Sequence, residues 1–164
     1  MPYFYPVKCK YVKQFIFIGI VVLLCLISCR KDENPVPVTS LTYKVLAIEG
    51  DARYSNLRTA GGSAVLQTGN LCAGHNCNGV VVYRVKVSGE CDDFRAFDRT
   101  CTFEASGSAM EIDESWPYIL RCPTCGSEFN MEGGYMEKGP AKNPLREFDC
   151  DFYEGDLSFR TVSK

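Results

Sequence analysis

Residues 122–126 read Cys-Pro-Thr-Cys-Gly, and this short turn constrains the fold more than any other part of the sequence. A Cys-Pro-x-Cys-Gly turn points two sulfur atoms into one small volume. The glycine allows a positive φ, so that backbone amides can face those sulfurs. Metal sites of several kinds and redox-active dithiols use this geometry. The turn alone therefore predicts sulfur chemistry and leaves the class of site open.

Two further segments flank this turn. Residues 96–103 read Ala-Phe-Asp-Arg-Thr-Cys-Thr-Phe, and residues 139–145 read Gly-Pro-Ala-Lys-Asn-Pro-Leu. In this order, the three segments resemble a Rieske domain. The resemblance implies an all-β fold, an antiparallel Rieske-like sandwich or barrel with two ligand-type loops. It also implies that residues 139–145 form a rigid loop beside the cluster site.

The two ligand loops depart from the family pattern at the histidines. Each loop in the family offers a Cys and a His, and the two histidines bind one iron of a [2Fe–2S] cluster. The family's cysteines fall on Cys101 and Cys122, whereas its histidine positions fall on Phe103 and Cys125. A phenyl ring has no lone pair to offer a metal, so an ordinary Rieske centre cannot form.

The N-terminus predicts a lipoprotein signal peptide over residues 1–28. It contains three lysines and no acid before the apolar run Phe15 to Ile27. That run is shorter than the roughly 20 residues that span a bilayer. Leu26 to Cys29 resembles a bacterial lipobox, which implies that Cys29 becomes the acylated first residue. Membrane lipid is then the expected partner, because several acyl chains give stable attachment.

Composition predicts a tether and one domain after the signal. Residues 29–40 contain two prolines and no apolar periodicity, which indicates a lipidated cysteine and a flexible tether. Residues 41–164 are long enough for one β domain with its own core. The signal holds three of the 18 basic residues and none of the 20 acidic ones, so the mature chain carries a net charge of −5. We therefore expect no nucleic-acid partner.

The expected location is the bacterial cell envelope, at the outer membrane. The Lys-Asp-Glu segment at residues 31–33, directly after the anchor, resembles the surface-export signal of lipoproteins in one group of Gram-negative bacteria. The alternative is a solvated charge cluster at the head of the tether. The first interpretation predicts a surface-exposed lipoprotein.

The cysteine count is odd after the anchor. Seven cysteines follow Cys29, and in an oxidising compartment most of them should pair. Cys72 and Cys77 bracket a short loop, for which we expect a disulfide. The alternative is a metal site, because Cys72-x-x-His75-x-Cys77 has metal-like spacing and His75 is the only histidine.

Hydrophobic alternation predicts the main strands. Gly79 to Val87 reads as a half-buried strand, with Val81, Tyr83, Val85 and Val87 on its buried face and Arg84 on the other. Leu145–Tyr153 and Leu157–Val162 read as a hairpin. We expect the single tryptophan, Trp116, to serve in packing and not as a platform for a ligand.

The sequence leaves three functional hypotheses. The first is a Rieske-like lipoprotein that lacks the cluster histidines, binds no cofactor and serves as a non-catalytic structural or binding domain. The resemblance places the sulfurs of Cys101 and Cys122 close together, and this hypothesis joins them in a disulfide that clamps the loops.

The second hypothesis is a metal or electron-transfer protein. In it Cys101, Cys122 and Cys125 bind zinc or an iron–sulfur centre, with a fourth ligand from His75, Cys91 or water.

The third hypothesis is a thiol–disulfide enzyme that uses Cys122 and Cys125. Enzymes of that kind place the active cysteine at a helix N-terminus, which lowers its pKa. No helix is readable after Cys125, and the sequence therefore gives this hypothesis the least support.

Overall fold

The structure is a computed structural model that describes residues 34–66, 68–103 and 107–161. Within these residues every strand pairing is antiparallel, and the strands form two sheets. The described part also holds two short 3-10 helices, η1 (Ala52–Arg58) and η2 (His75–Cys77). The predicted all-β antiparallel class is confirmed.

The two sheets differ in size. The larger sheet has six strands in the order β1-β10-β9-β4-β3-β2, and the smaller has four in the order β5-β6-β7-β8. The larger sheet comprises β1 (Tyr43–Val45), β2 (Ser63–Val65), β3 (Val80–Arg84), β4 (Phe94–Asp98), β9 (Glu147–Tyr153) and β10 (Asp156–Thr161). The smaller sheet comprises β5 (Glu111–Ile112), β6 (Ile119–Arg121), β7 (Glu128–Asn130) and β8 (Met136–Lys138).

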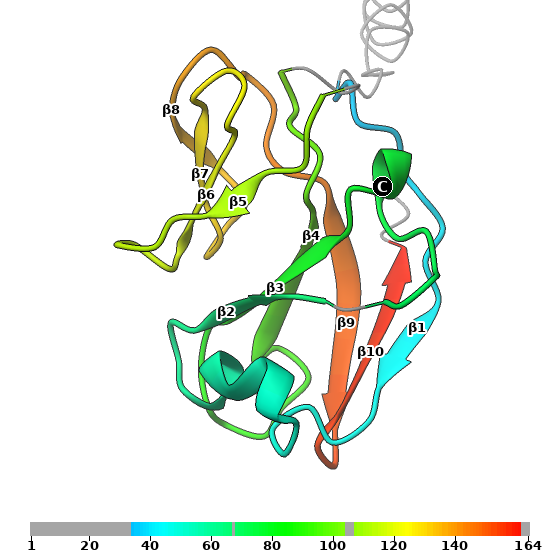
Figure 1. Ribbon diagram of the computed structural model, residues 1–164. Coiled ribbons are helices and arrows are strands. Elements are labelled where there is room, and N and C mark those ends of the chain that lie inside the picture. Colours follow the sequence, from blue (N-terminus) through cyan, green and yellow to red (C-terminus); the bar gives the residue numbers. More distant parts are fainter. Residues whose placement is uncertain (1–33, 67, 104–106, 162–164) are drawn as a thin grey trace, which may run out of the picture. The chain divides into compact units, whose positions relative to one another are not determined.

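The smaller sheet is an insertion between β4 and β9. These two strands of the larger sheet pair with each other, with Ala96 opposite Phe148. The chain therefore leaves the larger sheet after β4 and returns to it at β9, beside the point of departure. Figure 1 shows the smaller sheet, in yellow to orange, joined to the larger sheet by these two connections.

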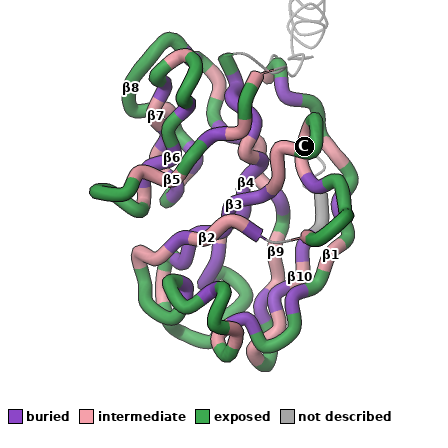
Figure 2. The backbone as a smooth tube through the Cα atoms, in the orientation of Figure 1, coloured by how far each residue is buried: buried purple, intermediate pink, exposed green. Residues whose placement is uncertain are grey.

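Two apolar clusters fill the interior, and β3 contributes to both. Figure 2 shows buried residues following β3 and β4. The first apolar cluster consists of Leu41, Val45, Ile48, Tyr54, Leu57, Leu66, Ala73, Val80, Val82, Phe94, Ala96, Phe148, Phe152, Leu157 and Phe159. The second apolar cluster consists of Val81, Tyr83, Phe97, Cys101, Met110, Leu120, Cys122, Phe129, Met131, Ala141 and Leu145.

The half-buried pattern predicted for Gly79 to Val87 is wrong. All five residues of β3 are buried, and its side chains alternate between the two clusters. The strand ends at Arg84, and Val85 and Val87 are 38% and 60% exposed. An alternating pattern predicts one solvent-exposed face only when no other element covers that face of the strand. Here each face of β3 packs against an apolar cluster.

Arg84 is buried rather than solvated. Its guanidinium group forms ion pairs with Glu49 and with Asp93, the latter over 3.3 Å, and donates to the Leu57 carbonyl over 2.9 Å. It also lies over the Phe94 ring, 4.7 Å from the centroid. Burial by itself raises the pKa of Asp93, but hydrogen bonds from Ser88, Gly89 and Arg84 outweigh it and lower that pKa to about 2. The buried cation is therefore fully paired, as burial of a charge requires.

The C-terminal hairpin forms as predicted. It turns at Glu154 and Gly155, which both have a positive φ. On β9, Phe148 and Phe152 are buried in the first apolar cluster. The thiol of Cys150 packs against that cluster and lies 3.0 Å from the Phe94 carbonyl. Burial raises the pKa of Cys150 to about 12, so this thiol is unreactive at neutral pH.

Residues 34–40, the last part of the expected tether, lie against the domain. Val36 is fully buried, and its carbonyl accepts two hydrogen bonds from the Arg146 guanidinium, of 3.0 and 2.8 Å. The side-chain amide of Asn34 donates to the Pro144 carbonyl over 2.9 Å. The β domain therefore begins before Leu41, because an apolar side chain in this segment finds a place in the interior.

The expected signal peptide, residues 1–28, and the expected lipid anchor, Cys29, lie outside the described residues. In the part of the chain that the structure describes, no helix has the length and apolar character needed to cross a membrane.

Candidate metal centre

Three cysteines meet where two loops approach each other. Cys101 follows β4, Cys122 follows β6, and Cys125 lies in the turn that leads to β7. Their three Sγ atoms all lie within 4.8 Å of one another, and those of Cys101 and Cys125 are 3.5 Å apart. Cys101 and Cys122 are buried, whereas Cys125 is partly exposed. We call these three residues the three-cysteine group.

Backbone hydrogen bonds shape the turn that carries two of these cysteines. The Cys122 N–H donates to the Ser127 carbonyl over 2.8 Å, and the Gly126 N–H donates to the Cys122 carbonyl over 3.0 Å. Gly126 has φ +72°, the left-handed conformation predicted for it, which glycine adopts without strain. The turn thus directs Cys122 inward to the second apolar cluster and leaves Cys125 at its rim.

The first cysteine loop is anchored to the larger sheet. The Thr100 N–H donates to one carboxylate oxygen of Asp98 over 2.9 Å, and the His75 N–H donates to the other over 2.6 Å. Asp98 is fully buried at the end of β4. Thr100 pairs with Ala109 across the loop. These contacts fix the backbone directly before Cys101.

The Gly139–Leu145 loop, which the family resemblance placed beside the cluster site, contacts both cysteine loops. The Ala141 N–H donates to the Ser127 hydroxyl oxygen over 3.1 Å, and the Thr102 hydroxyl donates to the Asn143 carbonyl over 2.7 Å. Gly139 passes so close to the turn that an added Cβ would lie 2.5 Å from the Ser127 Cα. This loop therefore holds the two cysteine loops in a fixed relation.

Ser127 has a role that sequence reasoning missed. It is fully buried, and its hydroxyl lies 3.1 Å from the Cys125 sulfur while it accepts the hydrogen bond from Ala141. The only signal for it in the sequence is its place two residues after Cys125, inside the motif. In the structure the Cys125 thiol donates to this hydroxyl, and when Cys125 is a thiolate the hydroxyl can donate its own proton to the sulfur.

Burial of Cys125 by itself raises the pKa of its thiol. Hydrogen bonds from the Ser127 side chain and backbone, and from Cys101 and Cys122, act in the opposite direction and lower the pKa below its ordinary value. A lower pKa increases the thiolate fraction near neutral pH. The thiolate is the form that binds metals and attacks disulfides.

The structure does not contain the disulfide that was expected between Cys101 and Cys122. Both residues are thiols in the structure, and the sulfur of Cys125 lies 3.5 Å from that of Cys101. All three sulfurs lie within 4.8 Å of one another, so both Cys122 and Cys125 lie near Cys101. In the structure, therefore, no Cys101–Cys122 disulfide joins the Cys101 loop to the Cys122–Cys125 turn.

The other cysteines lie away from this group. Cys72 and Cys77 form the expected disulfide, with an S–S distance of 1.96 Å, which closes the loop around His75. Cys91 is exposed and lines a shallow pocket together with Cys150. Among the described residues, neither His75 nor Cys91 joins the three-cysteine group as a fourth ligand.

A [2Fe–2S] cluster does not fit this donor set. Such a cluster needs four protein ligands, two on each iron. The described residues bring together only three, and Phe103, at the first histidine position, carries a ring that is 49% exposed and has no donor atom. The third hypothesis also lacks its structural requirement, because the chain after Cys125 enters β7 and forms no helix.

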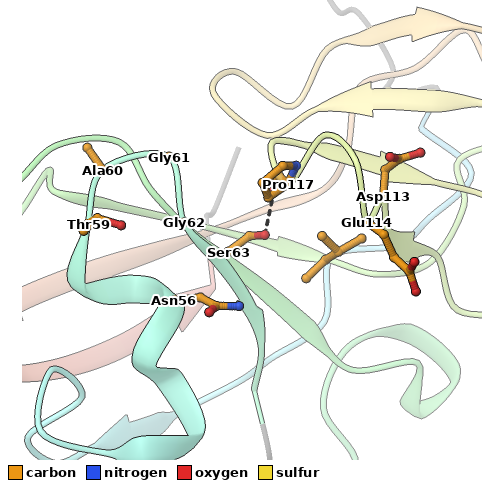
Figure 3. Close-up of a pocket in the computed structure, with 10 residues that line it drawn as sticks. Asn56, Thr59, Ala60, Gly61, Gly62, Ser63, Asp113, Glu114 and Pro117 are labelled. Atoms are coloured by element: carbon orange, nitrogen blue, oxygen red, sulfur yellow. Dashed lines mark hydrogen bonds between the residues drawn. The ribbon is translucent and has the colours of Figure 1, made fainter.

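A pocket of about 620 Å³ lies apart from this centre, between the η1–β2 connection and the β5–β6 loop (Figure 3). Asn56 and Thr59 line one side and Asp113 and Glu114 the other. The carboxylate of Asp113 is already bound by Arg121 and by the N–H groups of its own turn. None of the cysteines lines this pocket.

Trp116, expected to serve in packing, is 58% exposed in the loop beside this pocket. Its ring makes an edge contact with Tyr118, with 6.0 Å between the centroids. The loop turns outward because Asp113 caps it, accepting hydrogen bonds from the backbone of Ser115 and Trp116.

No protein-family model matches the chain, and no curated protein matches it. Among solved structures, the chain is similar to a chain of the complex of reduced oxygenase and oxidized ferredoxin in carbazole 1,9a-dioxygenase. The sequence identity is 23% and the TM-score is 0.46, over 71% of this chain and 99% of that chain. At this TM-score the likeness adds nothing to the strand pairing described above.

Proposed function

We propose that this protein is a lipid-anchored envelope protein whose Rieske-like β domain binds one zinc ion through Cys101, Cys122 and Cys125. The observation that carries this proposal is the three-cysteine group, with all sulfurs within 4.8 Å of one another. Sulfur ligands at about 2.3 Å from a tetrahedral zinc ion lie about 3.8 Å apart. The distance of 3.5 Å between Cys101 and Cys125 is close to that value.

The Rieske-like part of the proposal is supported by the arrangement of the three sequence segments. The loop after β4 and the turn after β6 meet at their cysteines, and the Gly139–Leu145 loop contacts both. The side chains at the two histidine positions, Phe103 and Cys125, then replace imidazoles with a ring that binds no metal and a thiol that does.

Zinc suits this donor set better than the cluster of the resembled family. Thiolates are preferred zinc ligands, and zinc sites with three protein ligands keep the fourth position for water. The role that we propose for the ion is to link the two cysteine loops. It would join the Cys101 loop to the Cys122–Cys125 turn, the function that a disulfide clamp was expected to perform.

Metal analysis of the protein tests this function. We expect one zinc per chain and no visible absorbance in protein extracted with detergent from the native membrane fraction under reducing conditions. Cys125→Ser should lower zinc affinity by more than the roughly 10- to 100-fold that loss of an outer-shell partner costs. Cys91→Ser, which changes an exposed thiol elsewhere, should leave zinc affinity unchanged.

Two results would overturn the zinc assignment. The first is a reduced, folded protein that takes up no zinc when zinc is added. The second is a coloured protein that contains iron in a ratio of one or more per chain.

The membrane part of the proposal is supported by the sequence at residues 1–33. We propose acylation at Cys29 and retention at the outer membrane, with export to the surface through the Lys-Asp-Glu segment. Cys29→Ala should move the chain from the membrane fraction to the soluble fraction. Retention of that variant in the membrane fraction would refute the anchor.

A further inference from the structure

We infer that the three-cysteine group has a second, metal-free state in which a disulfide joins Cys101 to Cys125, so that oxidation releases the zinc ion. The release of zinc on oxidation rests on the proposed zinc site. The disulfide itself depends only on the positions of the sulfurs. The bond would link the two loops that the ion holds together in the reduced state.

The distance between the Cys101 and Cys125 sulfurs permits a bond between them. Their Sγ atoms are 3.5 Å apart, and a disulfide requires about 2.05 Å. A shift of about 1.5 Å would therefore form the bond. The Gly139–Leu145 loop contacts both cysteine loops, so the folded domain already holds the two sulfurs near each other. Bond formation therefore needs no rearrangement of a sheet.

The turn that carries Cys125 is where such a shift can occur. Cys101 is fully buried, whereas Cys125 lies at the rim with its thiol partly exposed. The next residue, Gly126, has φ +72° and no heavy atom within 4 Å of the position a Cβ would occupy. The turn therefore has room on its outer side, and an oxidant can reach Cys125 before it reaches either buried thiol.

Cys122 is the residue left over. It is 1% exposed, and its backbone N–H is fixed to the Ser127 carbonyl. Once Cys101 and Cys125 are joined, Cys122 is the single thiolate of the group. One thiolate does not hold a zinc ion, which needs three or four protein ligands, so the ion leaves.

The electrons and protons balance through thiol–disulfide exchange with an oxidising disulfide carrier. The Cys125 thiolate attacks the carrier disulfide and forms a mixed disulfide, which releases one carrier thiolate. The Cys101 thiolate then attacks the Cys125 sulfur, forms the new bond and releases the second carrier thiolate. Two electrons pass to the carrier, whose two thiolates take up two protons. The zinc ion departs as Zn²⁺, and Cys122 takes up one proton.

The test uses the full-length protein in detergent, loaded with zinc and treated with oxidised glutathione. A zinc-sensitive dye measures release, and peptide mass spectrometry maps the disulfides. We expect release of one zinc ion for each Cys101–Cys125 cross-link, with Cys122 still open to alkylation after denaturation. The Cys91→Ser/Cys150→Ser variant should behave identically, because neither residue belongs to the group.

Cys122→Ser separates this inference from the zinc proposal. We expect this variant to form the Cys101–Cys125 cross-link although its zinc affinity is weakened. A cross-link in protein that never binds zinc would refute the zinc site and support the disulfide. Zinc that stays bound after oxidation, or a mapped disulfide that contains Cys122 in the wild-type protein, would overturn the inference.

Discussion

Two residues decide the chemistry of this domain, Phe103 and Cys125. They occupy the positions at which the Rieske resemblance places two histidines. Phe103 adds an exposed ring without a donor atom, whereas Cys125 adds a thiol within 3.5 Å of Cys101. The change removes both nitrogen ligands and gains one sulfur ligand. The site therefore favours a soft ion such as zinc over a cluster that needs four ligands.

At the scale of single residues, Ser127→Ala tests the hydroxyl that touches both Cys125 and Ala141. The change leaves the buried Ala141 N–H without its acceptor, which should lower the free energy of unfolding by roughly 1–3 kcal/mol. It also removes a hydrogen bond that lowers the pKa of Cys125. In reduced, metal-free protein, the pH profile for alkylation of Cys125 should therefore move to higher pH.

Ser158→Ala is the matched control for this prediction. The Ser158 hydroxyl is partly exposed and contacts the Asp151 carbonyl over 3.4 Å, a long hydrogen bond. Its loss should change the free energy of unfolding by less than about 0.5 kcal/mol. Urea denaturation measures the free energy of unfolding of Ser127→Ala and of Ser158→Ala. An unchanged alkylation profile in Ser127→Ala would show that the hydroxyl does not stabilise the thiolate.

At the scale of elements, the Gly139–Leu145 loop acts as the support for both cysteine loops. Gly139 combines φ +107° with an approach that would place a Cβ 2.5 Å from the Ser127 Cα. Gly61 has φ +84° and open space around it. Both positions disfavour a side chain through backbone conformation, but only Gly139 adds a steric clash.

Comparison of Gly139→Ala with Gly61→Ala isolates that clash. Gly61→Ala should cost about 1–2 kcal/mol of stability for the left-handed backbone alone. Gly139→Ala should cost a further roughly 1–3 kcal/mol, because the turn at Ser127 must move away. Urea denaturation gives both values, and zinc affinity should fall only in Gly139→Ala. Equal losses of stability in the two variants would mean that the loop yields without strain.

An element of the larger sheet could be predicted where its hydrophobic pattern and turn residues lie within a few neighbouring positions of the sequence. The alternation in Leu145–Tyr153 and the Glu154-Gly155 turn are properties of a few neighbouring residues, and the hairpin formed as expected. The burial of β3, in contrast, depends on residues that lie far from it in the sequence. Its second buried face exists because the chain inserts a smaller sheet after β4, which no pattern within Val80–Arg84 can indicate.

The same distinction holds at the site. Motif spacing placed Cys101, Cys122 and Cys125 together, because each lies at a fixed position in its loop. The separation of 3.5 Å between the Cys101 and Cys125 sulfurs depends on how the turn is held. Ser127, in the same turn, contacts Cys125 and accepts a hydrogen bond from Ala141 of the Gly139–Leu145 loop, and no pattern within the turn indicates this contact with a separate segment.

At the scale of the whole molecule, β3 and β4 join the two apolar clusters. Val80 and Val82 belong to the first cluster and Val81 and Tyr83 to the second, on one strand of five residues. Neither cluster can lose its contacts with β3 while the other keeps them. We therefore expect the described domain to unfold in one cooperative transition, although it contains two sheets.

Phe129→Leu and Phe159→Leu test this coupling, because Phe129 lies in the second cluster and Phe159 in the first. Each change should lower the free energy of unfolding by about 1–2 kcal/mol. Fluorescence of Trp116, the only tryptophan, reports on the smaller sheet, and circular dichroism reports on all strands. The two midpoints should fall together in both variants.

Val87→Ala, at a side chain that is 60% exposed, controls for loss of apolar surface outside the clusters and should leave both midpoints unchanged. The decisive case is Phe129→Leu. If its fluorescence midpoint falls while most of the circular dichroism change stays at the wild-type midpoint, the smaller sheet unfolds alone. The three-cysteine group would then belong to a unit less stable than the larger sheet, and metal or disulfide linkage there would stabilise that unit only. A common midpoint instead means that a bond or ion between the cysteine loops stabilises the larger sheet as well, because β3 transmits the gain to both clusters.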